Sequence, residues 1–149
     1  MHEEDLTQVM RRVELFRGLS QEQLKRIAGI SQREVYQRGQ TICVQGSPGD
    51  KIYIISHGQV EVVVQDSSGA AVPVVYLGTG QVVGEMALID EGKRSASVLG
   101  ADDDTIVYSI PHQDFRQLCA TDTGIGYVMM RNLAQDLSFK LRHRDTGGG

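Results

Sequence analysis

Residues 51–65, KIYIISHGQVEVVVQ, hold two short apolar segments on either side of the turn His57-Gly58-Gln59. In the second segment valines alternate with polar residues, which is the two-residue period of a strand with one buried face. The valines expected on the buried face are Val60, Val62 and Val64. The stretch therefore predicts two short strands separated by a tight turn.

Short segments of the same kind recur on both sides of this stretch, up to residue 110. They are EVYQ, TICV, VPVVYL, RSASVL and DTIVYSI, and turn residues such as QGSPGD, DSSGA and GTGQ separate them. Many short strands at a spacing of about ten residues are typical of a sandwich or a barrel. No helix-length segment lies between the early strands, which excludes a doubly wound parallel sheet.

Helical periodicity precedes the strands in residues 1–31. Apolar residues recur three and four positions apart, which places them on one helix face. They are Leu6, Val9, Met10, Val13 and Phe16. Gly18 breaks this segment, and Ser20 with Gln23 three residues later fits a capping box that opens a second helix.

Helical periodicity returns in residues 111–144, where Pro111 suits a first helical turn. A long helix is expected from about Thr123 to about His143. Its main apolar stripe is expected at Leu133, Leu137 and Leu141, with Ile125, Val128 and Phe139 projecting to another side. Residues 145–149 are expected to be a disordered tail.

The composition favours a single domain, residues 1–149, in the cytoplasm. With 15 Lys plus Arg against 19 Asp plus Glu, the net charge of −4 argues against a general nucleic-acid binder. Cys43 and Cys119 lack the spacing of a zinc or redox motif, so two free buried thiols are expected. No run reaches the ~18 apolar residues of a membrane span, and the N-terminus does not read as a secretion signal.

The stretch with recognisable chemistry is residues 84–98, GEMALIDEGKRSASV, which is longer than a tight turn between strands. A helical turn beginning at Glu85 would present free N–H groups to an anion, and Gly84 lacks the Cβ that would keep the anion away. Arg94 offers a planar fork of donors to one phosphate, and Ser95 adds a hydroxyl. Because Glu85 is an acceptor, it suits a sugar hydroxyl. These groups together predict a site for a ribose phosphate.

GEMAL, with Arg94 of RSASV nine residues after Glu85, resembles the phosphate-binding cassette of the cyclic nucleotide-binding domain family. LFRGLSQEQLKRIA resembles the leading helix of that family, and RGQTICVQGSPGDKIYIISHGQVEV resembles its first strands. The resemblance extends over about residues 12–144. It implies a mainly β fold: a jelly-roll-like antiparallel β-roll over residues 32–110, with the cassette at 84–97 and helices on both sides.

The resemblance also implies a role for each cassette residue. The groups implied to bind the cyclic phosphate are Arg94, Ser95 and the backbone N–H groups of Met86 and Ala87. Glu85, often with the backbone of Gly84, holds the ribose 2′-hydroxyl. Two positions depart from the family pattern, since Lys93 stands where many members carry proline and Val83 where an aromatic is common.

Simpler interpretations of the cassette stay open. Arg94 would then be a surface ion-pair partner of Glu85, Asp90 or Glu91, and Glu85 would only be a favourable charge at a helix N-terminus. In that case the chain is a ligand-independent interaction scaffold that has kept the fold.

No enzyme activity, metal or cofactor is expected. Only His57 among the histidines falls within the strands, so the paired histidines of a cupin metal site are missing. No GxSxG motif occurs. The few residues after the last helix cannot hold a helix-turn-helix module, so direct DNA binding is not expected.

The predicted function is a cyclic nucleotide sensor that prefers cAMP to cGMP, although Ser95 does not exclude guanine. Binding is expected to move the last helix and to act on an effector protein or a homodimer contact. Phe139, or failing it Arg142, is expected to cap the base; the alternative packs Phe139 on the N-terminal helices or in a dimer seam. A further alternative is the sensor part of a longer transcription factor or channel.

Overall fold

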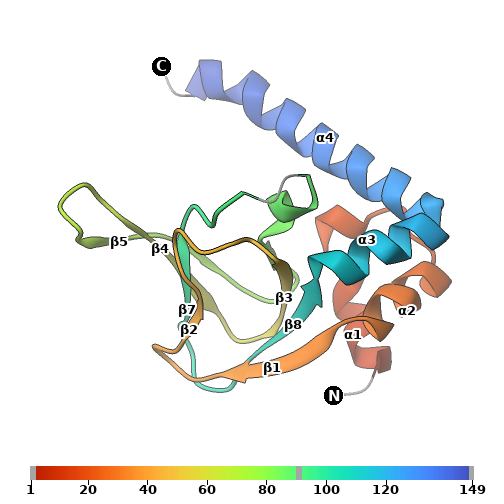
Figure 1. The fold of residues 1–149 in the computed structure, drawn as a ribbon, viewed down its shortest axis with the longest axis horizontal. Helices are drawn as coiled ribbons and strands as arrows, with labels where there is room; N and C mark the ends of the chain where they lie inside the picture. Colours follow the sequence, from red (N-terminus) through yellow and green to blue (C-terminus); the bar gives the residue numbers. More distant parts are fainter. Residues whose placement is uncertain (1–2, 90–91, 148–149) are drawn as a thin grey trace.

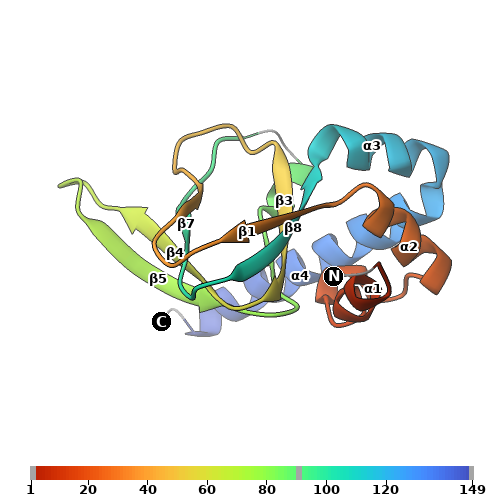
Figure 2. The ribbon, with the colours of Figure 1, turned by 90° about the horizontal axis from the view of Figure 1, so that it is seen from below.

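The computed structural model describes residues 3–89 and 92–147 and has the predicted antiparallel β-roll, with helices from both ends of the chain (Figure 1). Two four-stranded antiparallel sheets form the roll, in the orders β1-β8-β3-β6 and β2-β7-β4-β5. The strands are β1 (Gln32–Tyr36), β2 (Thr41–Cys43), β3 (Lys51–His57), β4 (Val60–Gln65), β5 (Ala71–Leu77), β6 (Val82–Val83), β7 (Ser97–Gly100) and β8 (Thr105–Pro111). Figure 2 shows the β4–β5 hairpin extending on the side opposite the N-terminal helices.

Strands β3 and β8 are buried on both faces, because they separate two hydrophobic cores. Successive side chains of a strand point to opposite faces, so each strand contributes to both cores in alternation. The strand residues packed under the helices are Ile52, Ile54, Tyr108 and Ile110. Those in the second core are Tyr53, Ile55 and Val107, which pack with Cys43, Val60 and Val98. We call the first set, with its helix partners, the helix-side cluster, and the second set the inner cluster.

The first helix is shorter than the sequence pattern predicts. Helix α1 spans Glu3–Met10, and the chain then tightens into i→i−3 hydrogen bonds before the 3-10 helix η1 (Glu14–Phe16). The predicted burial of Val13 and Phe16 is nevertheless confirmed, since both side chains lie in the helix-side cluster. Burial of these two side chains therefore prevails over continuation of the helix.

The second helix, α2 (Gln21–Gly29), begins with the predicted capping box. The Ser20 hydroxyl accepts from the Gln23 N–H at 3.1 Å, and the Gln23 side chain accepts from the Ser20 N–H at 3.0 Å. Two N–H groups that have no intrahelical partner are thereby satisfied, which sets the start of α2.

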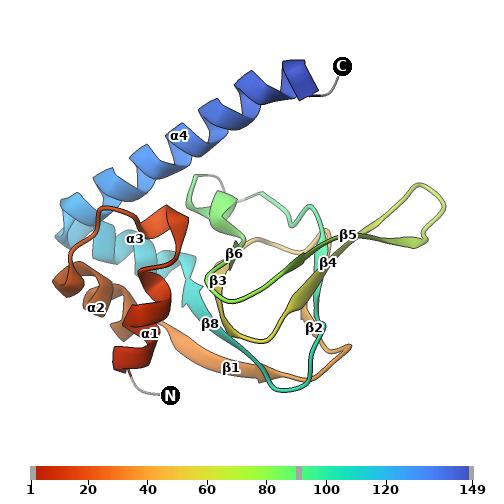
Figure 3. The ribbon, with the colours of Figure 1, turned by 180° about the vertical axis from the view of Figure 1, so that it is seen from behind.

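The chain ends in α3 (His112–Thr121) and the long helix α4 (Thr123–Gly147), which extends out from the helical body in Figures 1 and 3. The predicted stripe of α4 is confirmed at Leu133, which is 3% exposed, and is wrong at its distal end. The buried positions are Ile125, Met129 and Leu133, whereas Leu141 is 61% exposed. Only the first half of α4 packs on the body, so the stripe follows the contact surface and not the full helix length.

Helix α4 runs one turn past its expected end, so the predicted tail at residues 145–149 begins within the helix. Residues 148 and 149 lie outside the described residues, as do residues 1, 2, 90 and 91. Within the described ranges, no helix combines the length and apolar content needed to cross a bilayer.

Candidate functional site

The cassette lies between β6 and β7 and begins with a glycine in the left-handed region. Gly84 has φ +83°, and Glu85–Leu88 form the 3-10 helix η2, which is the single helical turn that the sequence predicts. Gly84 is the N-cap residue and has no side chain that could bond to the first turn. The backbone N–H groups of Met86 and Ala87 lie in that turn, where N–H groups lack intrahelical partners.

The turn before β3 holds the backbone around Arg94. The Arg94 N–H donates to the Ser47 carbonyl at 2.7 Å, and the Gly46 N–H donates to the Arg94 carbonyl at 2.8 Å. Pro48 and Lys93 form an isolated antiparallel bridge beside these bonds. Lysine at this position therefore leaves the cassette paired to the neighbouring turn.

The Arg94 side chain reaches across to the start of β3. Its Nη2 donates to the carbonyl oxygen of Lys51 at 2.7 Å, and its guanidinium carbon lies 5.7 Å from the centroid of the Tyr53 ring. Its Nε is buried and has no hydrogen-bond partner. Arg94 makes no ion pair with Glu85, and the other two carboxylates of the alternative interpretation, Asp90 and Glu91, lie outside the described residues.

This conformation of Arg94 requires glycine at position 84. A Cβ added to Gly84 would lie 2.2 Å from Nη1 of Arg94 and 2.9 Å from the Lys51 carbonyl oxygen. Real Cβ atoms do not approach other atoms so closely, and the φ of +83° is one that other residues rarely adopt. Gly84 thus lets the guanidinium lie directly against the cassette backbone.

Five of the predicted ligand residues line a single cavity of about 220 Å³. They are Gly84, Glu85, Met86, Arg94 and Ser95, joined by Gly49, Gly92 and Lys93. The sixth, Ala87, lies in η2. The structure therefore brings together the cassette residues that the sequence groups into one site.

An apolar hollow of about 250 Å³ adjoins this cavity and shares Gly84, Glu85, Arg94 and Ser95 with it. Its other walls are Cys43, Val62, Val75, Leu77, Val82, Val83, Ala96 and Val98. Burial raises the pKa of the Cys43 thiol, although the nearby Arg94 charge acts in the opposite direction. Burial also raises the pKa of Tyr53 to about 12, with a smaller contribution from Glu34. Both groups are therefore neutral near pH 7.

A third opening, a cleft of about 690 Å³, is lined by residues of η1, of α4 and of the end of β5. Glu85 lines this cleft as well as the cavity and the hollow, and Phe139 of α4 lines it with Lys140. Phe139 is 60% exposed and its ring stacks on His143, with ring centroids 3.9 Å apart. It does not pack on the N-terminal helices, so that part of the alternative is wrong. Arg142 is exposed and lines a separate hollow with Phe139, away from the cassette.

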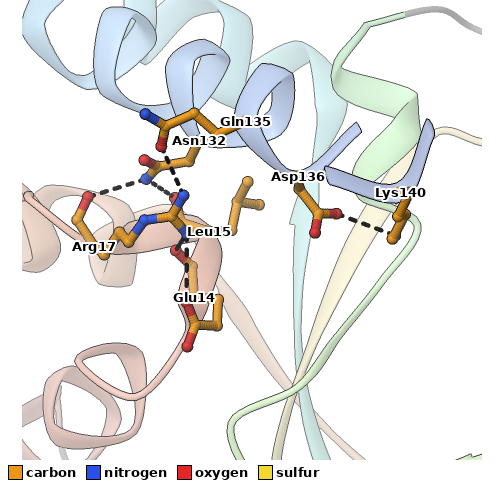
Figure 4. A network of polar contacts seen from close by, with 7 residues as sticks. All are labelled: Glu14, Leu15, Arg17, Asn132, Gln135, Asp136 and Lys140. Carbon is orange, nitrogen blue, oxygen red and sulfur yellow. Dashed lines mark hydrogen bonds and ion pairs between the residues drawn. The ribbon is translucent and has the colours of Figure 1, made fainter. Parts of the chain in front are cut away.

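Polar contacts fasten the middle of α4 to η1 (Figure 4). Asn132 is 1% exposed, and its Nδ2 donates to the carbonyl of Leu15 at 2.7 Å and to that of Arg17 at 3.0 Å. Arg17 donates in turn to Gln135 at 2.9 Å. Beyond this anchor the distal half of α4, residues 134–147, carries the exposed side chains of Phe139 and Leu141. Asn132 is therefore the last deeply buried polar attachment before α4 extends away.

The sequence interpretation missed Lys51, Tyr53 and Asn132. Lys51 acts through its backbone carbonyl, which no residue type reveals. Tyr53 reads as an ordinary strand residue, because only the pairing of β3 with the cassette places it near Arg94. Asn132 lies seven residues after Ile125 and three after Met129, on the same helix face, and a polar residue on an apolar face was the signal that could have found it.

Among the residues that the structure describes, no group of three or more His, Cys, Asp or Glu side chains could hold a metal ion. Cys43 and Cys119 are both free.

Comparisons with a family model and with known proteins identify the same family. The family model "Cyclic nucleotide-binding domain" matches residues 33–122. The cyclic AMP receptor protein of Thermus thermophilus is 32% identical over 131 residues, which cover 88% of this chain and 58% of that protein. The cGMP-dependent protein kinase isozyme 1 of Drosophila melanogaster is 32% identical over 117 residues, 77% of this chain and 15% of the kinase. The chain thus spans little more than half of the first relative and a small part of the second.

The fold has a similar solved structure in the N-terminal domain of a transcriptional regulator from Streptomyces coelicolor A3(2). The TM-score is 0.83 at 24% identity, and the match covers 91% of this chain and 93% of that domain. This similarity supports the arrangement of sheets and flanking helices.

Replacing Gly84 tests the geometry of the cassette. Gly84→Ala should lower the free energy of unfolding by about 1–3 kcal/mol more than Gly69→Ala, because the new methyl group overpacks against backbone. Gly69 is a matched control: its φ is +85°, but a Cβ there meets nothing within 4 Å. Urea unfolding measures both. Equal losses for the two variants would contradict the close approach of the Lys51 carbonyl and the Arg94 guanidinium to Gly84.

Proposed function

The chain belongs to the cyclic nucleotide-binding domain family, and from this we propose that it senses a cyclic nucleotide, with cAMP preferred, at the cavity between Gly84 and Arg94. The match to the kinase covers only 15% of that protein, so its enzymatic name does not extend to this chain. The proposed role is regulatory: the ligand binds, and the rearranged domain acts on something else.

The observation that carries the proposal is the state of Arg94. Its Nε is buried without a hydrogen-bond partner, while one Nη is fixed by the Lys51 carbonyl. A buried charged donor without an acceptor is unfavourable, and a phosphate oxygen in the adjoining cavity would relieve it. Because the side chain is already held in place, little conformational entropy is lost when the phosphate arrives.

The remaining cassette groups suit the rest of the ligand. The Ser95 hydroxyl and the N–H groups of Met86 and Ala87 donate to the other phosphate oxygens. Glu85, with the Gly84 backbone beside it, accepts from the ribose 2′-hydroxyl. Since Glu85 lines the phosphate cavity, the apolar hollow and the cleft below α4, the base would lie in either of the last two spaces.

The proposed preference for cAMP rests on Ser95. In the family, a threonine at the Ser95 position is associated with guanine selection, and serine lacks the methyl group that restricts the rotamer. One of the two relatives described above is named a cyclic AMP receptor and the other a cGMP-dependent kinase. Family membership alone therefore does not distinguish cAMP from cGMP as the ligand.

Competition titration with the two nucleotides tests this preference. A labelled cyclic nucleotide should be displaced at a lower concentration of cAMP than of cGMP, because Ser95 lacks the methyl group of the threonine that is associated with guanine selection. Displacement at a lower concentration of cGMP would overturn the proposed preference for cAMP. It would not contradict the proposed phosphate site.

Two substitutions separate the phosphate contact from the ribose contact. Arg94→Ala should weaken the binding of cAMP by about 2–5 kcal/mol. Arg94→Lys should weaken it nearly as much, because an ammonium group cannot make the bidentate contact of a guanidinium. Glu85→Gln should weaken the binding of cAMP and leave the affinity for 2′-deoxy-cAMP nearly unchanged. Calorimetric titration of both ligands measures these effects, with thermal unfolding as the control for folding.

Wild-type affinity in Arg94→Ala would remove Arg94 from the phosphate role. Equal losses toward cAMP and 2′-deoxy-cAMP in Glu85→Gln would remove Glu85 from the ribose role.

The signal is proposed to pass through η2 to α4. Leu88 of η2 packs against the helix-side cluster, which also contains Ile125 and Met129 of α4. A phosphate that draws η2 toward Arg94 would shift Leu88 within this cluster. Asn132 holds α4 to η1, so the distal half of α4 would close toward the cleft about this point. The ligand acts only through its greater affinity for the closed arrangement.

The distal half of α4 is the proposed output surface. Its exposed Phe139 and Leu141 change environment when α4 closes, and an effector protein or a second copy of the chain would detect that change.

Phe139 tests both closure and base capping. Phe139→Ala should weaken cAMP and cGMP by about 1–3 kcal/mol, because an aromatic ring stacked on the base is lost, and should not affect a ribose cyclic phosphate without a base. Amide hydrogen exchange in residues 134–143 should slow when the wild-type chain binds cAMP. Unchanged nucleotide affinity in Phe139→Ala, or unchanged exchange on binding, would contradict the closing helix.

A further inference from the structure

Tyr53 lies at the point where β3 meets the cassette. It is 7% exposed, belongs to the inner cluster, and is paired with Val83 in the β3–β6 register, one residue before Gly84. The same strand supplies the Lys51 carbonyl that accepts from Arg94. Strand β3 therefore presents two groups to the guanidinium, a carbonyl at residue 51 and a ring at residue 53.

The ring contacts Arg94 as a cation–π partner. The guanidinium carbon is 5.7 Å from the ring centroid, within the range at which the negative face of an aromatic ring attracts a cation. The Tyr53 hydroxyl stays protonated in this site, because burial raises its pKa to about 12. The attraction thus comes from the face of a neutral ring and not from a phenolate.

A neutral ring differs from a carboxylate as a partner for this arginine. A carboxylate would occupy the N–H groups that a phosphate needs, and the ligand would have to displace it. A ring face attracts the cation and uses none of the in-plane N–H donors. Together with the Lys51 carbonyl, it stabilises a partly buried cation whose Nε stays available.

We propose that Tyr53 is a positioning residue for the phosphate site: its ring holds the Arg94 guanidinium in the orientation that receives the ligand. The inference rests on the proposed function, in which Arg94 binds the cyclic phosphate. Tyr53 itself does not touch the ligand in this arrangement; it acts through Arg94.

Removing and retaining the ring gives the first test. Tyr53→Leu should lower the affinity for cAMP by roughly 2- to 30-fold, which is the range expected for a lost cation–π contact. The affinity of Tyr53→Phe should stay within about twofold of that of the wild type. Tyr36→Leu is the matched control, because Tyr36 packs on the same inner cluster and its hydroxyl donates to Glu34. That variant should lose stability in urea without losing cAMP affinity.

Ring fluorination gives a second test that does not depend on how well Tyr53→Leu folds. Tyr53→Phe carrying one, two or three ring fluorines keeps nearly the same volume while the negative charge of the ring face falls. The logarithm of the cAMP dissociation constant should rise steadily with the number of fluorines. A merely structural ring would give a flat series.

The outcomes distinguish this inference from the proposed function. If the wild type binds cAMP and Arg94→Ala does not, a flat fluorine series or full affinity in Tyr53→Leu overturns the role of Tyr53 alone. If Tyr36→Leu loses as much cAMP affinity as Tyr53→Leu, the effect is general to the inner cluster and the role is again overturned. If the wild type binds no cyclic nucleotide, both the proposed function and this inference fail.

Discussion

The hydrogen bond from Arg94 to the Lys51 carbonyl is the contact around which the cassette is arranged. It brings a cation from the connection before β7 to the first residue of β3, and it is possible only because Gly84 has no Cβ. The backbone bonds between Arg94 and the turn at Gly46 and Ser47 hold the same junction from the other side. A glycine in the left-handed region and a backbone carbonyl therefore hold the arginine in the position that the proposed phosphate site requires.

Strand β3 connects this geometry to the rest of the molecule because both of its faces are buried. Lys51 and Tyr53 meet Arg94, while Ile52 and Ile54 lie in the helix-side cluster. That cluster contains the first half of α4 and receives Leu88 from η2. Densely packed interiors transmit small shifts instead of absorbing them. The helix-side cluster thus joins η2 of the cassette to the first half of α4.

Much of the fold and of the cassette could be predicted from the sequence, because local rules determine them. The capping box at Ser20, the left-handed Gly84 and the helical turn after it depend on residues within a few positions of each other. The partners of Arg94 could not be predicted, since Lys51 is 43 residues away and contributes only a carbonyl. The predicted stripe on α4 failed only at its distal end, because helical periodicity gives the faces of a helix and does not tell how far along its length a neighbour extends.

The central claim is that the Nε–H of Arg94, which has no hydrogen-bond partner, donates to the phosphate of the ligand. Proton–nitrogen NMR of the arginine Nε–H groups tests this claim most directly. The Arg94 signal is identified by its loss in Arg94→Lys. Adding cAMP should move this signal downfield in a saturable way, because the Nε–H gains a charged acceptor. Adenosine, which lacks the phosphate, should leave it in place. An Arg94 signal that does not move at saturating cAMP would contradict the account.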